Sequence, residues 1–156
     1  MNTNNTIPDV CELLPHGAGM TFIQTLEHCE NGHAVARVNL KSLALFSDEV
    51  GRLPSYLGLE CMVQTVAAMV GFKRYRNREQ PLVGLILGTR RCRFEEANFP
   101  SEGMLTVEIK TLMMEEPLGV FEGKVLSDER VIVHGQVKAI QPQTESQLNE
   151  LLAGTL

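Results

Sequence analysis

The segment formed by residues 53–74 constrains the fold more than any other part of this chain. Between residues 57 and 70 it carries one charged side chain, Glu60, in an otherwise apolar run. An apolar stretch of about 20 residues is too long for a strand, and Pro54 suits the first turn of a helix. We therefore expect one long helix that is buried over most of its surface.

The carboxylate of Glu60 is unusual in such a helix. Burying an ionised carboxylate costs several kcal/mol unless it is paired, so burial favours the protonated form, which suits a general acid. A structural interpretation stays open, in which Glu60 lies at the helix rim and is held by a backbone amide or by Gln64 one turn further on.

The residues before this helix contain a second unusual segment, Leu14-Pro15-His16-Gly17. Residues 10–14 predict a helical turn that ends at Pro15, and His16 follows in a Gly-containing loop. Residues 20–29 and 33–40 are β-branched, partly alternating runs around the turn signal Glu30-Asn31-Gly32, which predicts an antiparallel hairpin. An acid and a base are therefore available from two separate segments.

The second half of the chain predicts an antiparallel meander. Runs suited to strands cover residues 82–87, 90–96, 103–113, 119–126 and 131–140, with turn signals at intervals of roughly ten residues. Residues from 143 onward are polar with a weak helical repeat, which predicts a tail or a short surface helix. We expect a flexible start over residues 1–9, one domain over residues 10–142 and a tail over residues 143–156.

Composition narrows the class of protein. The chain has 156 residues, of which 44% are hydrophobic and 21% charged, so it suits one globular domain. Its net charge of −5 argues against general nucleic-acid binding, and no apolar run approaches the roughly 18 residues that span a membrane. The N-terminus lacks the pattern of a secretory signal, so we expect a cytoplasmic protein. The four cysteines have no metal-ligand spacing, and we assign them no disulfide and no metal.

A hairpin, one long helix and then a meander describe an α+β protein in which an antiparallel sheet wraps around a helix. This arrangement resembles the hotdog fold, with five to six strands around one central helix. Residues 14–16 and 54–64 resemble the active-site pair of the β-hydroxyacyl-acyl carrier protein dehydratases. Residues 58–64 and 87–91 are most similar to the branch of that family associated with aryl polyene pigments. The resemblance covers roughly residues 10–142.

Dehydration of a 3-hydroxyacyl thioester to the trans-2-enoyl product needs three groups. A neutral imidazole takes the Cα proton, a protonated carboxyl protonates the leaving hydroxyl, and a backbone amide at a helix N-terminus binds the charge on the thioester oxygen. We assign these roles to His16, Glu60 and the amide near Ser55, with Gln64 orienting the carboxyl. The resemblance implies that His16 and Glu60 act together from different subunits of a homodimer, or of a heterodimer with another hotdog subunit.

The resemblance also implies a substrate carried on the phosphopantetheine of acyl carrier protein, and no metal or redox cofactor. Two departures affect the substrate tunnel. Family members often have Arg and Pro after the histidine, where this chain has Gly17-Ala18-Gly19, and residues 46–51 replace a Phe-Pro-Gly-rich loop. These changes alter the loop that holds His16 and the width of the tunnel.

Basic residues gather in two short stretches although the chain is acidic. One interpretation is a solvated helix end, because cations favour helix C-termini. The other is a docking patch for the acidic carrier protein. The seven candidate residues are Lys73, Arg74, Arg76, Arg78, Arg90, Arg91 and Arg93.

Two further functions stay open from the sequence. In a hotdog thioesterase, Glu60 would activate water against the thioester carbonyl, although hydrolysis does not need the base at His16. In a non-catalytic role, this chain would be the structural or carrier-binding half of a heteromeric hotdog dehydratase. The remaining histidines, His28, His33 and His134, are weaker candidates for any functional role.

Overall fold

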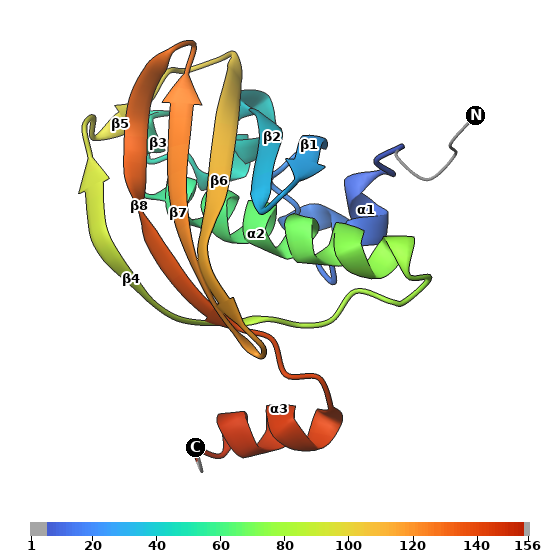
Figure 1. Ribbon diagram of the computed structural model, residues 1–156. Coiled ribbons are helices and arrows are strands. Elements are labelled where there is room, and N and C mark those ends of the chain that lie inside the picture. The colour runs from blue at the N-terminus through green and yellow to red at the C-terminus, as the bar shows by residue number, and fades with distance from the viewer. Residues whose placement is uncertain (1–5, 155–156) are drawn as a thin grey trace.

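The computed structural model describes residues 6–154 and is an antiparallel sheet wrapped around one long helix (Figure 1). The helices are α1 (Val10–Leu13), α2 (Leu57–Arg76) and α3 (Glu145–Leu152), with short 3₁₀ helices η2 (Ala18–Met20) and η3 (Leu40–Phe46). The strands are β1 (Thr25–Glu30), β2 (His33–Asn39), β3 (Leu53–Pro54), β4 (Leu85–Phe94), β5 (Asn98–Phe99), β6 (Met104–Glu115), β7 (Leu118–Ser127) and β8 (Arg130–Ile140).

Six strands form the main sheet in the order β1-β2-β6-β7-β8-β4, and every neighbouring pair is antiparallel. β3 and β5 form a separate two-stranded pair beside the start of α2. The expected hotdog arrangement of six strands around one long central helix is therefore confirmed, and so is its α+β class.

Alternation along the strands places the core between the sheet and α2. In β6, Leu105, Val107 and Ile109 are fully buried, while the residues between them are partly exposed. Glycine permits close packing: a Cβ at Gly58 would lie 3.0 Å from a Val133 methyl group. The sheet and the N-terminal part of α2 are therefore in direct contact.

Helix α2 begins four residues later than the sequence predicts. Pro54 lies in β3, where it pairs with Asn98, and not in the first helical turn. The Ser55 N–H donates to the Ala97 carbonyl at 2.9 Å, which continues the pairing with β5 by one bond, and a turn at residues 55–56 then leads into α2 at Leu57. The expectation of a helix from residue 53 is wrong because this tertiary pairing outweighs the local preference of proline.

The strands predicted on either side of α2 also differ from those in the structure. Residues 20–24 do not join β1, which begins at Thr25, and residues 18–20 form η2 instead. The runs 82–87 and 90–96 merge into one strand, β4, with an irregularity between Arg90 and Arg93 where Arg91 has φ 52°. Residues 88–89, which separate the two expected runs, therefore lie inside one strand, next to a register shift between Ile86 and Gly88.

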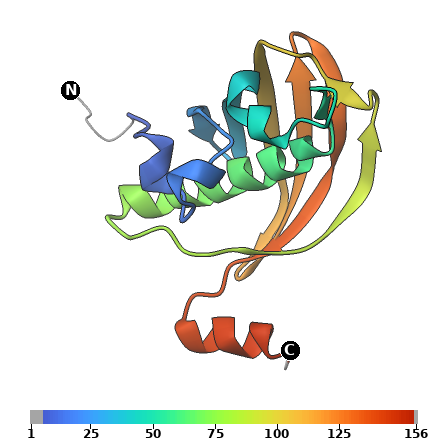
Figure 2. The same ribbon diagram turned by 180° about the vertical axis from the view of Figure 1, so that it is seen from behind.

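β4 is an edge strand, and all of its residues are partly or fully exposed. After β8 the chain continues to α3, which stands apart from the sheet in both views (Figures 1 and 2). The helical alternative for the tail is thus the one observed. Within residues 6–154, every helix is too short or too polar to cross a membrane.

Candidate active site

The His16 loop is positioned by the packing of α1 against α2. Asp9 caps α1 by accepting a hydrogen bond from the Cys11 N–H at 3.0 Å, and this bond lowers the pKa of the Asp9 carboxyl. Leu13 and Leu14 are buried, and a Cβ at Gly71 would lie only 2.0 Å from the Leu13 carbonyl oxygen. Glycine at position 71 is therefore what lets the end of α1 reach the surface of α2.

His16 follows directly and lines a cavity of about 520 Å³ beside α2. Its side chain is half-buried, and Nδ1 is fully buried with no hydrogen-bond partner among the described residues. An unpaired buried nitrogen costs roughly 1–3 kcal/mol, so such groups concentrate at sites that receive a ligand or water. His16 thus borders the cavity, and its Nδ1 is buried and free of any partner among the described residues.

Glu60 and Gln64 meet on the same face of α2. Gln64 Nε2 donates to Glu60 Oε1 at 2.8 Å, which uses one carboxyl oxygen and leaves Oε2 without a partner among the described residues. Gln64 is completely buried, whereas Glu60 is partly exposed. The contact needed for Gln64 to orient the carboxyl is present, and its catalytic role stays a prediction.

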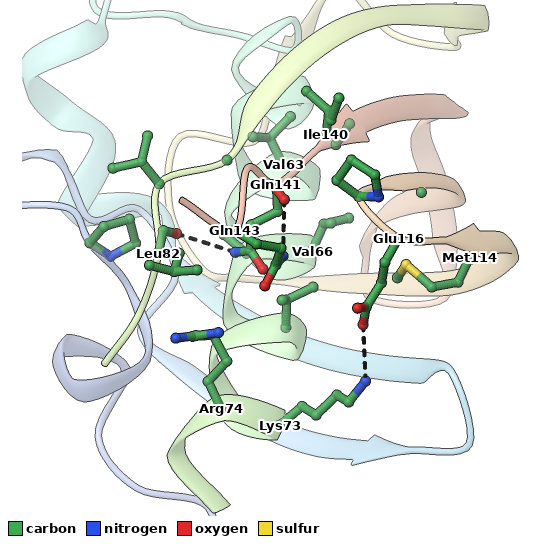
Figure 3. A pocket seen from close by; sticks show the side chains of 18 of the residues that line it. Val63, Val66, Lys73, Arg74, Leu82, Met114, Glu116, Ile140, Gln141 and Gln143 are labelled. Carbon is green, nitrogen blue, oxygen red and sulfur yellow. Dashed lines mark hydrogen bonds and ion pairs between the residues drawn. The ribbon is translucent and has the colours of Figure 1, made fainter. Parts of the chain in front are cut away.

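The cavity runs along α2 and changes character along its length. Its helix wall is apolar, and Figure 3 shows Val63 and Val66 from α2 on this side. Its far rim is polar: Lys73 Nζ lies 3.5 Å from Glu116 Oε1, and Gln141 Nε2 donates to the Leu82 carbonyl at 3.3 Å (Figure 3). The wall suits an apolar chain, and the rim suits a charged or polar group.

Ser55 is placed differently from the sequence prediction. Its side chain is buried and its Oγ donates to the Glu96 carbonyl, while its own N–H is bonded to Ala97. The Ser55 N–H is therefore already used in a structural hydrogen bond to the Ala97 carbonyl. In the described part of the chain, the Tyr56 and Leu57 N–H groups are the ones left unpaired at the start of α2, so they are the available donors near Ser55.

The seven basic residues form two groups rather than one patch. Lys73 and Arg74 line the cavity near the start of β4, together with Leu82. Arg93 lies near the other end of β4, about 25 Å further along at 3.3 Å per residue. There Phe94 pairs with Val133, which packs on the N-terminal turn of α2. The expected single docking surface is therefore divided between opposite ends of α2.

A family model for ApeP-like proteins, described as ApeP dehydratase, matches residues 8–153. The chain belongs to the ApeP-like dehydratase family. This confirms the resemblance to the aryl polyene branch of the hotdog dehydratases that the sequence indicates. Among curated proteins, none matches the chain in sequence.

Solved structures agree with the family and the fold. A chain of the ApeI:P dehydratase heterocomplex from Xenorhabdus doucetiae is 26% identical with a TM-score of 0.88, over 94% of this chain and 99% of that one. A mutant thioesterase from Staphylococcus aureus is 12% identical with a TM-score of 0.58, over 75% and 91%. A hypothetical thioesterase with coenzyme A from Streptococcus pneumoniae is also 12% identical with a TM-score of 0.58, over 76% and 84%. The latter two share the fold alone.

In this ApeP-like dehydratase the two predicted catalytic groups do not line one cavity. His16 borders the cavity, and Glu60 is not among the residues that line it, although Val63 in the next turn is. Within residues 6–154, no group of three or more His, Cys, Asp or Glu side chains is arranged to hold a metal ion. Within a single chain, His16 therefore borders this cavity and Glu60 lies outside it.

Sequence reasoning missed the charged pairs at the polar rim. Arg74 Nη1 lies 2.9 Å from Glu79 Oε2, and its Nε donates to the Gln80 carbonyl at 2.7 Å. The closeness of Arg74 and Glu79 in sequence is a signal that indicates such a pair. Nothing local indicates that Glu116, from the turn between β6 and β7, reaches Lys73 on α2.

Proposed function

We propose that this dehydratase converts a 3-hydroxyacyl thioester, carried on acyl carrier protein, to the trans-2-enoyl thioester in aryl polyene or similar fatty-acid-like biosynthesis. The observation that carries the proposal is the buried, unpartnered Nδ1 of His16 at the wall of a largely apolar cavity. A neutral imidazole in such a place is a base without a competing partner. Membership of a dehydratase family supports the reaction class.

The reaction balances with two proton transfers. His16 removes the Cα proton, and charge develops on the thioester oxygen near the amides at the start of α2. Glu60, protonated at Oε2, gives its proton to the departing hydroxyl as the Cβ–O bond breaks. The Cα–Cβ double bond forms, water leaves, and a proton returns from His16 to Glu60 before the next cycle. No metal or redox cofactor is needed for this sequence.

A second hotdog subunit completes the proposed site. β4 has an unpaired edge, and Glu60 lies outside the cavity that His16 lines. A subunit that extends the sheet at β4 would bring its own helix beside this one, so that His16 of one subunit meets the acid of the other. The match to a chain of the ApeI:P heterocomplex supports a hotdog partner subunit, and a second copy of this chain is the alternative.

Of the two basic groups, the one at the end of α2 is the proposed docking surface for the carrier protein. Lys73 and Arg74 border the cavity, and Arg76 and Arg78 follow on the exposed helix end. A carrier bound there has its thioester arm beside the cavity mouth. Arg90, Arg91 and Arg93 lie further along β4, the edge strand at which the proposed partner subunit pairs, so they are left out of this docking surface.

Mass spectrometry of carrier-bound 3-hydroxyacyl substrates tests the function directly. Substrates with alkyl, conjugated and aromatic acyl groups would be incubated with the chain alone and with a candidate hotdog partner. We expect loss of one water from the carrier-bound acyl group. Release of a free thiol without loss of water would instead indicate a thioesterase, and no change under either condition would indicate a non-catalytic subunit.

A further inference from the structure

We infer that Gln64 is a positioning residue for both reacting groups, because its one buried amide joins the Glu60 carboxyl to the segment that follows His16. This inference rests on the proposed function. It extends the sequence prediction, in which Gln64 orients Glu60 alone. The amide makes three hydrogen bonds, and two of them leave α2 for the His16 loop.

These three hydrogen bonds are short, and each has a different partner. Gln64 Nε2 donates to Glu60 Oε1 at 2.8 Å and to the Met20 carbonyl at 2.7 Å. Gln64 Oε1 accepts the Phe22 N–H at 2.7 Å. The Gln64 side chain is fully buried, and its bond to the Phe22 N–H is buried as well, so loss of the amide leaves that N–H unsatisfied.

Residues 17–20, which follow His16 directly, make few contacts with the rest of the chain. Gly17 and Gly19 would have no atom within 4 Å of an added Cβ, and no residue of η2 is buried. The remaining bonds in the turn are local, from the Met20 N–H and the Thr21 hydroxyl to the Gly17 carbonyl. The loop is thus fastened before His16 by the contact of α1 with Gly71. After it, the chain is held by the Gln64 amide and by the buried side chains of Phe22 and Ile23, and the centroid of the Phe22 ring lies 4.9 Å from that of Phe46.

This arrangement compensates for the residues that follow His16. A Gly-Ala-Gly stretch has high conformational freedom and does not hold a preceding imidazole in place. The buried amide of Gln64 supplies that restraint from α2. The same atom group also orients the carboxyl one turn earlier, so the position of the base and that of the acid depend on one side chain.

Replacing Gln64 with Met, which has a similar volume and no hydrogen-bonding amide, tests the inference. We expect kcat for dehydration to fall by about a hundredfold with KM within about twofold, as for misplaced catalytic groups. Thr65→Val is the matched control, because Thr65 is also buried on α2 and bonds only the Cys61 carbonyl. The control should keep kcat within about twofold of the wild type.

Two readouts separate the loop from the carboxyl. Amide exchange at Phe22 should accelerate in Gln64→Met and stay slow in Thr65→Val. In Gln64→Met the imidazole NMR signals of His16 should shift or broaden, while those of the other three histidines serve as unchanged internal references. Adding Gly17→Ala and Gly19→Ala to Gln64→Met should recover about fivefold in kcat, because alanine restricts the loop where space is open.

The inference is overturned if Gln64→Met loses kcat while Phe22 exchange and the His16 signals stay as in the wild type, because Gln64 would then act on Glu60 alone. It is also overturned if kcat changes no more than in Thr65→Val. Inactivity of the wild type toward every substrate would instead contradict the proposed function. The exchange and NMR measurements need no substrate, so they decide the restraint of the loop in either case.

Discussion

The two ends of helix α2 carry polar groups of opposite character. Near its start, Gln64 is 0% exposed and its three bonds measure 2.7 to 2.8 Å. Near its end, the side chains of Lys73 and Glu116 are 74% and 64% exposed and their charged atoms lie 3.5 Å apart. Buried bonds of the first kind fix positions within fractions of an ångström, whereas exposed pairs of the second kind contribute 0–1 kcal/mol and are screened by salt.

This difference assigns separate tasks to the two ends. The first end suits chemistry, which depends on the placement of a few atoms. The second suits association with a charged partner, which depends on long-range attraction and tolerates mobile side chains. Variants at the first end should therefore change kcat, and variants at the second should change the apparent KM.

The largest expected effect is at the catalytic pair. His16→Ala and Glu60→Gln should each lower the dehydration rate by at least about a hundredfold, because each removes a proton-transfer group. Circular dichroism and thermal unfolding should show that both variants fold as the wild type does. Turnover close to the wild-type rate in either variant would break the assignment of the chemistry to these two residues.

Mixed dimers sharpen the same assignment. If the chain forms homodimers with His16 and Glu60 from different subunits, mixing His16→Ala with Glu60→Gln should restore about a quarter of the wild-type rate. Half of the dimers would then be mixed, and each would contain one intact site of two. Light scattering measures whether the chain is a dimer under the assay conditions. An active monomer at assay concentration would rule out a shared site.

A smaller effect is expected from the basic end of α2. Because Arg74 is held by Glu79 and Gln80, the exposed Arg76 and Arg78 are the better pair to reverse. Changing both to Glu should raise the apparent KM for carrier-bound substrate about fivefold and flatten its dependence on salt. Turnover of a free pantetheine thioester should stay constant.

Lys41→Glu with Lys110→Glu provides the control for that experiment, since these exposed residues lie outside both β4 and the cavity lining. This pair should leave the KM for carrier-bound substrate within about twofold. An equal rise in the apparent KM for both pairs of variants would show that the position of the charges on the surface is irrelevant. An equal loss of turnover on the free pantetheine thioester would place the end of α2 in the active site.

The smallest effect is expected at two cysteines, the buried Cys61 on α2 and the partly buried Cys29 on β1. Burial raises the pKa of the Cys61 thiol to about 12 and that of Cys29 to about 11, against 9.0 for a free thiol. The protonated thiols are favoured in the folded state, so this contribution is complete below pH 9 and is lost as pH rises toward 11 to 12. Iodoacetamide at pH 8 should leave both unmodified without denaturant, as peptide mass mapping can check.

The sequence predicts the fold largely through one feature, a long apolar run with a single charged residue between positions 57 and 70. It also predicts the contact between Glu60 and Gln64, because residues four apart share a helix face. It does not predict that Pro54 joins β3 or that Gln64 reaches Met20 and Phe22. Those contacts join residues more than 40 positions apart, so neither local propensity nor residue spacing indicates them.

The exposed edge at β4 links folding to assembly. A strand whose backbone is unpaired along one side, with Ile86, Leu87 and Phe94 each more than 40% exposed, is a template for any other strand when the partner subunit is missing. Production of this chain alone therefore favours insoluble material, and co-expression with its partner favours recovery. Where assembly is reversible, the melting temperature rises with protein concentration, because association stabilises only the folded chain.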